Sequence, residues 1–241
     1  MSEIIVESRF RGPPRSGNGG YVTGLFARLA GGPRSVMVRA PVPLDTPMTF
    51  DPATATVTLG DQLIAQANPA DHAVLPDPPA APSLAEAEAA GARAGPSFHS
   101  ICVCCGDKIG ADEGLRVFVG QLADAEPGLV AGVWDVHTAF VDDDGLVPEE
   151  LVWAAIDCPG FVAWVAKDGR HGALTGTMQA EVLRRPAAGE RCIVLGWPIE
   201  RPSERREVAG VALFAADGTL MARGLQTWIR MPPRPPQPDD R

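Results

Sequence analysis

The sequence lacks any apolar run long enough to cross a membrane as a helix. Its first residues, MSEIIVESRFRGPP, place acidic side chains before any apolar run, and no small-residue cleavage site follows, so we expect no secretory signal. Basic residues are scarce, with 21 Lys and Arg against 30 Asp and Glu. The net charge of -9 argues against nucleic acid as a partner, because phosphate binding depends on basic surface. These absences predict a cytoplasmic protein that binds neither membrane nor nucleic acid.

Cysteine occurs five times, an odd number that favours a reducing compartment over a disulfide framework. Three cysteines crowd into FHSICVCCGDKIG, where Cys102 and Cys105 form a C-x-x-C pair with His99 and Asp107 close by. A structural zinc ion needs four ligands, and the sequence has no second C-x-x-C pair. We therefore expect no bound metal, and a zinc site at this pair is the alternative.

Proline and glycine divide the chain into segments. The stretch LPDPPAAPSLAEAEAAGARAGP predicts a Pro/Ala-rich linker over residues 75–97, with a short alanine-rich helical pattern in its middle. It separates an N-terminal half, residues 1–74, from a C-terminal domain, residues 98–231. The ending PPRPPQPDDR, residues 232–241, has nothing to bury and predicts an extended, disordered tail.

A weak internal repeat relates the two halves. In the first, a helical stretch (YVTGLFARLA) stops at Gly31 and Gly32 and is followed by the strand-like runs SVMVRAPV, TATVTL and QLIAQA. In the second, the strand-like runs GLRVFVG and LVAGVWDV precede a helix that starts near Pro148, and the strand-like runs LTGTMQAEVL, RCIVLGWPI, EVAGVALFA and TLMARGLQTWI follow it. The clearest correspondence relates TVTLGDQLIAQA to ALFAADGTLMARG. Each copy predicts one helix followed by an antiparallel meander, which is an α+β arrangement.

The helix of the second copy contains Pro159 followed by Gly160. A proline inside a helix removes a backbone donor and clashes with the preceding turn, so we expect a kink or a division there. Asp157 is then expected two residues before the break, among apolar neighbours that are typical of a functional rather than a solvated carboxylate.

These features together resemble the double-hotdog acyl-coenzyme A thioesterases, in particular proteins similar to bacterial thioesterase II. Three short matches carry the resemblance: Asp157 in WAAIDCPG, Thr175 in LTGTMQ and Gln226 in DGTLMARGLQTWIR. The resemblance implies two fused hotdog domains, each a long helix wrapped by a curved antiparallel sheet, with these three residues as the catalytic set and no cofactor. Thr177 competes with Thr175, because a shift of two residues keeps the same strand face.

A second resemblance is to single-hotdog thioesterases of the phenylacetate type, which carry His-Gly-Gly at the helix start and an aspartate further along the same helix. Here Asn18, Gly19 and Gly20 lie in the first half without the aspartate, and Asp157 lies in the second half without the glycines. If the halves pair with their helices side by side, one composite site results. The resemblance implies that Asn18, Gly19 and Gly20 bind the substrate, although Asn18 also suits a plain helix N-cap.

The chemistry implied is hydrolysis of an acyl-CoA thioester. Asp157 would act as general base on a water that Thr175 and Gln226 position, and free N–H groups at Gly19 or Gly20 would stabilise the oxyanion. Coenzyme A is polyanionic, so a local basic patch is expected, with solvated arginines on exposed strand ends and turns as the alternative. The candidates for the patch are Arg184, Arg185, Arg201, Arg205 and Arg206. His137, in DVHTAF, is a further candidate for the mouth of the site, with a structural role as the alternative.

Two alternatives remain open at this point. One is an acyl-CoA-binding hotdog protein without turnover, since a fold alone does not establish activity. The other is a hotdog enoyl-CoA hydratase or dehydratase, suggested by QANPADH at Gln66 to His72. For any of these we expect a homo-oligomer, as a dimer of double hotdogs.

Overall fold

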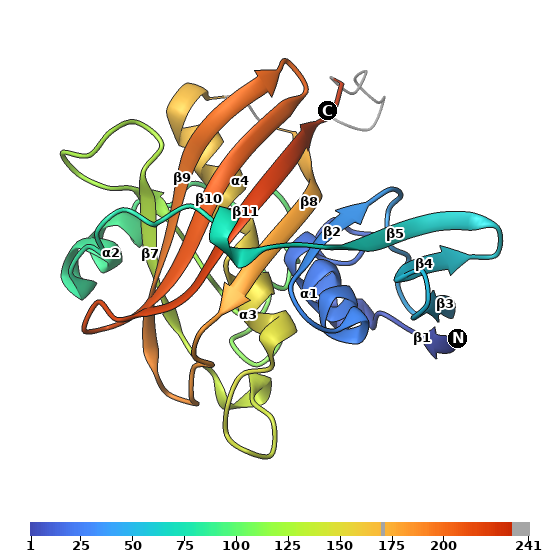
Figure 1. Ribbon diagram of the computed structural model, residues 1–241. Coiled ribbons are helices and arrows are strands. Elements are labelled where there is room, and N and C mark those ends of the chain that lie inside the picture. The colour runs from blue at the N-terminus through green and yellow to red at the C-terminus, as the bar shows by residue number, and fades with distance from the viewer. Residues whose placement is uncertain (170–171, 233–241) are drawn as a thin grey trace, which may run out of the picture.

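The computed structural model describes residues 1–169 and 172–232. Within these residues, eleven strands form one antiparallel sheet in the order β1-β3-β4-β5-β2-β8-β11-β10-β9-β7-β6 (Figure 1). The strands of the first half are β1 (Ser2–Ile4), β2 (Arg34–Val38), β3 (Met48–Asp51), β4 (Thr56–Leu59) and β5 (Gln62–Pro69), with helix α1 (Gly19–Ala30) between β1 and β2. Short 3-10 turns cover Ser8–Phe10, His72–Val74 and Thr138–Phe140.

The second half repeats this plan at larger size. Its strands are β6 (Gly120–Gln121), β7 (Val130–Asp135), β8 (Ala173–Val182), β9 (Arg191–Ser203), β10 (Arg206–Ala215) and β11 (Leu220–Arg230). Two consecutive helices, α3 (Glu149–Ala155) and α4 (Asp157–Asp168), connect β7 to β8. Helix α2 (Leu84–Gly91) lies between the two halves in the sequence.

The strand order is the same in both halves. Going inward from the outer strand, the first half runs β1-β3-β4-β5-β2, and the second runs β7-β9-β10-β11-β8 inside the short edge strand β6. The halves meet where β2 pairs with β8, Val36 opposite Met178. The hairpins β4–β5 and β10–β11, whose sequences gave the clearest repeat, occupy equivalent places. The prediction of two fused hotdog units is thus confirmed, with one difference. The strand after each helix pairs with the last strand of its half, so the strands do not form a simple meander.

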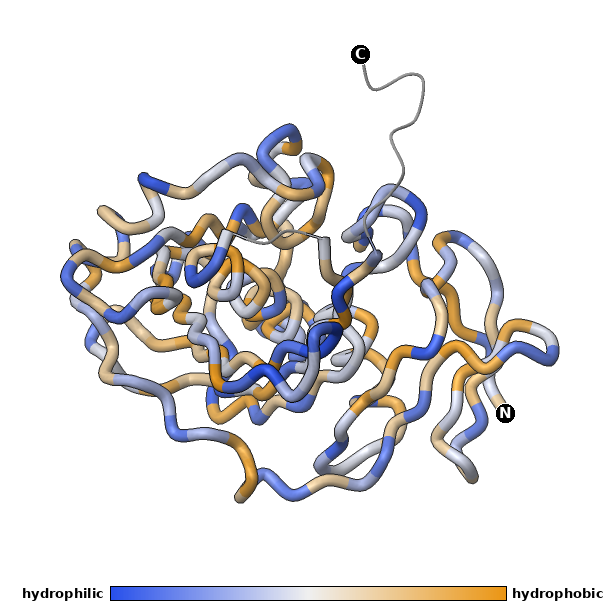
Figure 2. The backbone as a smooth tube through the Cα atoms, turned by 90° about the horizontal axis from the view of Figure 1, so that it is seen from above, coloured by the Kyte–Doolittle hydropathy of each residue, from blue (hydrophilic) through white to orange (hydrophobic). Residues whose placement is uncertain are grey.

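The two halves also pack through their helices. Gly20 and Gly24, one turn apart on α1, face α3, where a Cβ on Gly24 would lie 2.8 Å from the Cα of Glu150. Such close approach requires glycine and brings the backbones of α1 and α3 together. Figure 2 shows hydrophobic stretches in the strands and helices of both the smaller N-terminal half and the larger C-terminal half. Among the described residues no helix is both long and apolar enough to cross a membrane.

The second helix divides, as its proline predicts, but the break lies earlier than expected. Ile156, with φ -95° and ψ 4°, ends α3 and precedes α4, so Asp157 is the first residue after the break rather than two residues before it. Pro159 then occupies the first turn of α4, where a missing N–H costs nothing. Its ring excludes the helical bond to the carbonyl of Ala155, and that oxygen accepts from the thiol of Cys104 at 3.8 Å instead.

Three further segments differ from or extend the sequence predictions. The run GLRVFVG is not a strand until Gly120, because Arg116 adopts a left-handed φ of 55° and the N–H groups of Leu115 and Val117 bind carbonyls of the cysteine segment. Within the stretch 75–97, α2 packs two fully buried alanines, Ala87 and Ala90, on the sheet. The tail expected over 232–241 lies, from residue 233 on, outside the described residues.

Candidate functional site

The carboxylate of Asp157 lies between the two halves and is only 2% exposed. One oxygen, Oδ1, accepts from the Thr175 hydroxyl at 3.0 Å, and the other, Oδ2, accepts from the Asn18 side-chain amide at 3.0 Å. The backbone N–H of Gly20 donates to the same carboxylate. Asn18 and Gly20, at the start of α1, therefore lie against Asp157 and Thr175 of the second half. The complementary motifs of the two halves predicted that these segments would meet.

Asn18 is an N-cap and also contacts Asp157, while the substrate binding expected of it stays a prediction. Its Oδ1 caps α1 by accepting from the N–H of Tyr21 at 2.9 Å, while its Nδ2 donates to Asp157. The same amide nitrogen lies 3.8 Å from the sulfur of Cys102. The side chain is buried, and each end of the amide is used. The cap thus fixes the orientation in which the amide reaches Asp157.

The glycines beside Asn18 are required by close packing. A Cβ on Gly19 would lie 2.1 Å from the hydroxyl oxygen of Thr175, and a Cβ on Gly20 would lie 2.3 Å from the carbonyl oxygen of Trp153 and 2.6 Å from the Cβ of Asp157. No side chain fits at either position. The predicted oxyanion role is open to the N–H of Gly19, since the N–H of Gly20 is directed at Asp157.

Burial dominates the electrostatics of Asp157. The pKa of this carboxyl is raised to about 7, mainly because the group is removed from water and in smaller part by Cys102, against the Gly20 N–H, the Thr175 hydroxyl and the Asn18 amide, which lower it. The thiols of Cys105 and Cys158 in turn hold the pKa of Cys102 well below its usual range. A charge on Cys102 therefore affects the protonation of the Asp157 carboxyl.

Gln226 lies directly behind the site, and its amide is fully engaged. Its Nε2 donates to the carbonyls of Ile156 and Asp157 at 3.2 and 3.1 Å, and its Oε1 accepts from the indole N–H of Trp228 at 2.9 Å. A Cβ on Gly160 would lie 1.9 Å from that Oε1, so only glycine fits there. These contacts tie Gln226 on β11 to the break between α3 and α4. The water-positioning role expected for Gln226 stays a prediction. Its contacts favour a different role, in which Gln226 holds the backbone of Asp157 in place.

The threonine in contact with Asp157 is Thr175 rather than Thr177. The pairing of β8 with β11 shifts between these two positions, where Thr177 lies opposite Thr227 and Thr175 opposite Trp228. The shift leaves Gly176 as an extra residue on β8, which changes the direction of the neighbouring side chains. Sequence periodicity assumes an unbroken strand and so cannot separate the two threonines.

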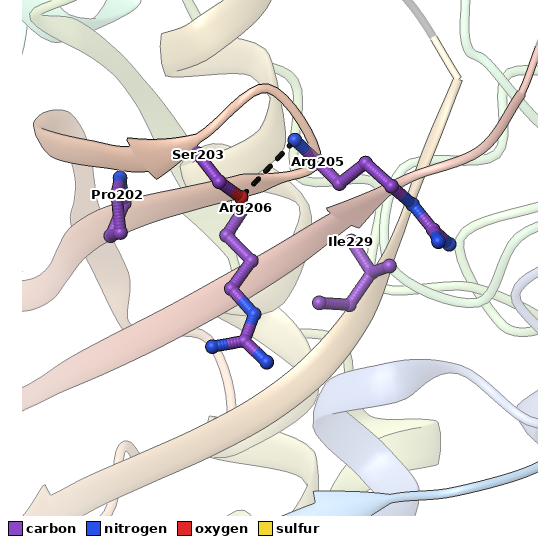
Figure 3. Close-up of a pocket in the computed structure, with 5 residues that line it drawn as sticks. All are labelled: Pro202, Ser203, Arg205, Arg206 and Ile229. Atoms are coloured by element: carbon purple, nitrogen blue, oxygen red, sulfur yellow. Dashed lines mark hydrogen bonds between the residues drawn. The ribbon is translucent and has the colours of Figure 1, made fainter.

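The arginines and histidines considered from the sequence have varied surroundings. Arg184, Arg185 and Arg201 form ion pairs with nearby carboxylates. Arg205 and Arg206 line a surface cavity of 470 Å³ with Pro202, Ser203 and Ile229 (Figure 3). His137 is exposed and caps a 3-10 turn by accepting from the N–H of Ala139, and His72 lies 3.3 Å from Glu181.

Sequence reasoning missed the proximity of the cysteines to this site. Cys102 touches the Asn18 amide, and Cys158 directly follows Asp157 in the chain and lies 3.9 Å from Cys102, sulfur to sulfur. The spacing from the C-x-x-C pair to Cys158 exceeds fifty residues, so no local motif signals the contact. All five cysteines are free thiols.

No family model and no curated protein matches the chain. Solved structures that it resembles include zebrafish thioesterase superfamily member 2, at 18% identity over 50% of this chain and 85% of that chain, with a TM-score of 0.43. A mutant of the phenylacetic acid degradation protein PaaI from Thermus thermophilus matches at 19% identity, over 46% of this chain and 92% of that chain, with a TM-score of 0.40. A hypothetical thioesterase with coenzyme A from Streptococcus pneumoniae matches at 11% identity, over 48% and 88%, with a TM-score of 0.42.

Proposed function

We propose that this protein hydrolyses an acyl-CoA thioester to the free acid and coenzyme A, with Asp157 as general base. The observation that carries the proposal is the buried Asp157 carboxylate, which accepts from the Asn18 amide, the Thr175 hydroxyl and the Gly20 N–H. The three donors lower the pKa of the carboxyl and burial raises it, and the resulting value of about 7 is one at which a general base works near neutral pH. A carboxylate offers about four acceptor positions, so one position remains for a water molecule.

In the proposed reaction Asp157 takes a proton from that water as the water oxygen attacks the thioester carbon. The carbonyl oxygen becomes an oxyanion, which the N–H of Gly19, at the first position of α1, stabilises together with the positive end of the helix dipole. The tetrahedral intermediate then collapses, its carbon–sulfur bond breaks, and the departing thiolate takes the proton from Asp157. The carboxylate is thereby restored, and no covalent intermediate forms on the protein.

The cavity beside Arg205 and Arg206 supports a place for the phosphates of coenzyme A. Guanidinium groups bind phosphate with two hydrogen bonds and full charge complementarity. Ile229, which lines this cavity, pairs in the sheet with Leu174, the residue before Thr175. We propose that the nucleotide binds at these arginines and that the acyl-pantetheine arm extends along β8 and β11 toward Asp157.

The test is the release of free thiol by the purified protein from acyl-CoA esters of graded chain length, with crotonyl-CoA followed separately for hydration. We expect release above the spontaneous rate for at least one ester, and the preferred length reports the size of the acyl site. Hydration of crotonyl-CoA without thiol release would replace this proposal with the hydratase alternative. Binding of acyl-CoA with no turnover of any ester would replace it with the acyl-binding alternative.

A further inference from the structure

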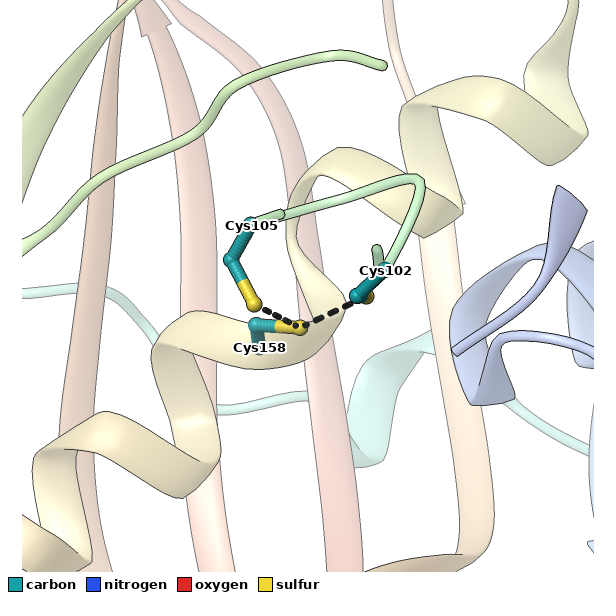
Figure 4. A group of neighbouring side chains, drawn as sticks. All are labelled: Cys102, Cys105 and Cys158. Carbon is teal, nitrogen blue, oxygen red and sulfur yellow. Dashed lines mark hydrogen bonds between the residues drawn. The ribbon is translucent and has the colours of Figure 1, made fainter. Parts of the chain in front are cut away.

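Three thiols from two distant segments meet beside the candidate site. Cys102 and Cys105 come from the segment between α2 and β6, and Cys158 comes from the first turn of α4 (Figure 4). The sulfur of Cys158 lies 3.3 Å from that of Cys105 and 3.9 Å from that of Cys102, and all three sulfurs lie within 4.8 Å of one another. Figure 4 shows the side chains converging between the loop and the helix.

The loop around the C-x-x-C pair has the hydrogen bonds of a turn that holds a metal-binding thiolate. The backbone N–H groups of Cys104 and Cys105 donate to the sulfur of Cys102, and the N–H of Gly106 donates to the carbonyl of Cys102 at 2.7 Å. A Cβ on Gly106 would lie 2.5 Å from that carbonyl oxygen, so the turn accepts only glycine. Backbone donors aimed at one sulfur stabilise a negative charge there, which a metal ligand carries and a buried neutral thiol does not.

The segment that carries the pair needs an anchor. Residues 95–119 contain neither helix nor strand, and a loop of this length inside a compact domain is unusual unless a function or a cross-link maintains it. Among the described residues, one backbone hydrogen bond attaches it to the rest of the chain, from the N–H of Val103 to the carbonyl of Arg11, whereas the N–H of Val117 donates to Cys104 within the loop itself. A bound metal would join the middle of this loop to α4.

We propose that Cys102, Cys105 and Cys158 bind one zinc ion through their thiolates. Tetrahedral zinc with its usual bond to sulfur places ligand sulfurs about 3.8 Å apart, and the separations of 3.3 and 3.9 Å bracket that value. A soft, all-thiolate set selects zinc over the hard cations that prefer oxygen. His99 lies outside the group formed by these three sulfurs, so the fourth position of the tetrahedron is left to water or another small ligand. Binding releases the thiol protons to solvent, so no oxidant or reductant is involved.

The zinc ion would stand next to the candidate site and fix its geometry. Cys158 follows Asp157 in the chain, and the Asn18 amide contacts both the Cys102 sulfur and the Asp157 carboxylate. One ion would therefore hold the start of α4, the cysteine loop and the start of α1 in register. The zinc site does not depend on the thioesterase proposal, because its ligands and its test are separate from turnover.

The test is the metal content of the protein purified under reducing conditions and incubated with zinc chloride, measured by mass spectrometry after gel filtration. We expect about one zinc per chain at saturation, from one set of ligands. The variants Cys105→Ser and Cys158→Ser are expected to lose the metal, and the matched variant Cys192→Ser, at a buried cysteine in β9 away from the cluster, is expected to keep it. Replacement of zinc by cobalt in the unaltered protein gives a second readout, a near-ultraviolet thiolate-to-cobalt charge-transfer band.

A wild-type protein that is folded and reduced yet binds no zinc and shows no such band would overturn the proposal. So would zinc that persists at full occupancy in both Cys105→Ser and Cys158→Ser. Because the cobalt measurement uses the unaltered chain, failure of a serine variant to fold leaves the proposal open to refutation.

Discussion

The contact between the halves predicts a specific effect of Gly20→Ala. The added methyl group would lie 2.3 Å from the carbonyl oxygen of Trp153 and 2.6 Å from the Cβ of Asp157. The first of these atoms belongs to the backbone of α3 and has no rotamer through which to move away. Relief therefore requires a shift of α1 away from α3 and α4, which also carries the Gly20 N–H and the Asn18 amide away from Asp157.

The size of the effect follows from two opposing contributions. Overpacking costs about 1–3 kcal/mol, and a contact with rigid backbone belongs at the upper end of that range. Alanine in place of glycine in a helix returns up to about 1 kcal/mol. We expect a net loss of about 1–2 kcal/mol in the free energy of unfolding, which for a chain of this length lowers Tm by about 2–8 °C.

Two glycine variants separate packing from chemistry. Gly24→Ala introduces a clash one turn along the same face, 2.8 Å from the Cα of Glu150 and without contact to Asp157, and Gly95→Ala adds a methyl group with nothing within 4 Å. Calorimetry should show lower Tm for Gly20→Ala and Gly24→Ala, while thiol release should fall only for Gly20→Ala. If Gly20→Ala matches Gly95→Ala in both Tm and turnover, the halves do not meet as described.

Three further substitutions test individual contacts. Thr175→Val removes the hydrogen bond to the Asp157 carboxylate, so we expect kcat for thiol release to fall about 10- to 100-fold. The matched variant Thr177→Val should stay near wild type, and equal rates for the two variants would contradict the assignment of Thr175 to the site. Gln226→Leu removes two hydrogen bonds to the carbonyls of Ile156 and Asp157 and leaves the buried indole N–H of Trp228 without its partner. We expect denaturant titration to show a loss of about 2–3 kcal/mol, and a change under about 1 kcal/mol would speak against its role at the helix break. Asn18→Ser keeps an N-cap and Asn18→Ala does not, while both lose the amide donor to Asp157. The alanine variant should therefore be about 1 kcal/mol less stable than the serine variant, and both should lose turnover; unchanged turnover in both would remove Asn18 from the site.

Much of the architecture was predictable because it repeats. The glycine turns in TVTLGDQLIAQA and ALFAADGTLMARG fix two hairpins that hold equivalent places in the sheet. The complementary distribution of Asn18, Gly19 and Gly20 in one half and Asp157 in the other predicted a composite site, and the structure brings these residues together. Local patterns succeed here because each motif marks the same point in a repeated unit.

Other features depend on contacts that no local pattern records. Proline chemistry predicts a break in the second helix, but its position before Asp157 reflects the clash of the Pro159 ring with the preceding turn and the capture of two carbonyls by Gln226. The choice of Thr175 depends on an irregularity in the pairing of β8 with β11. The third thiol, Cys158, reaches the C-x-x-C pair only after the chain has folded, so a count of cysteines along the sequence cannot associate it with that pair.

The central claim is that Asp157 is the base of a composite site, and Asp157→Asn tests it most directly. The amide has nearly the same shape but does not take up a proton, so we expect kcat for thiol release to fall about 100- to 10,000-fold. Titration calorimetry with acyl-CoA should give unchanged affinity, and Asp61→Asn, at an exposed turn between β4 and β5, should match wild type in both measurements. Undiminished turnover in a folded Asp157→Asn variant would contradict the account.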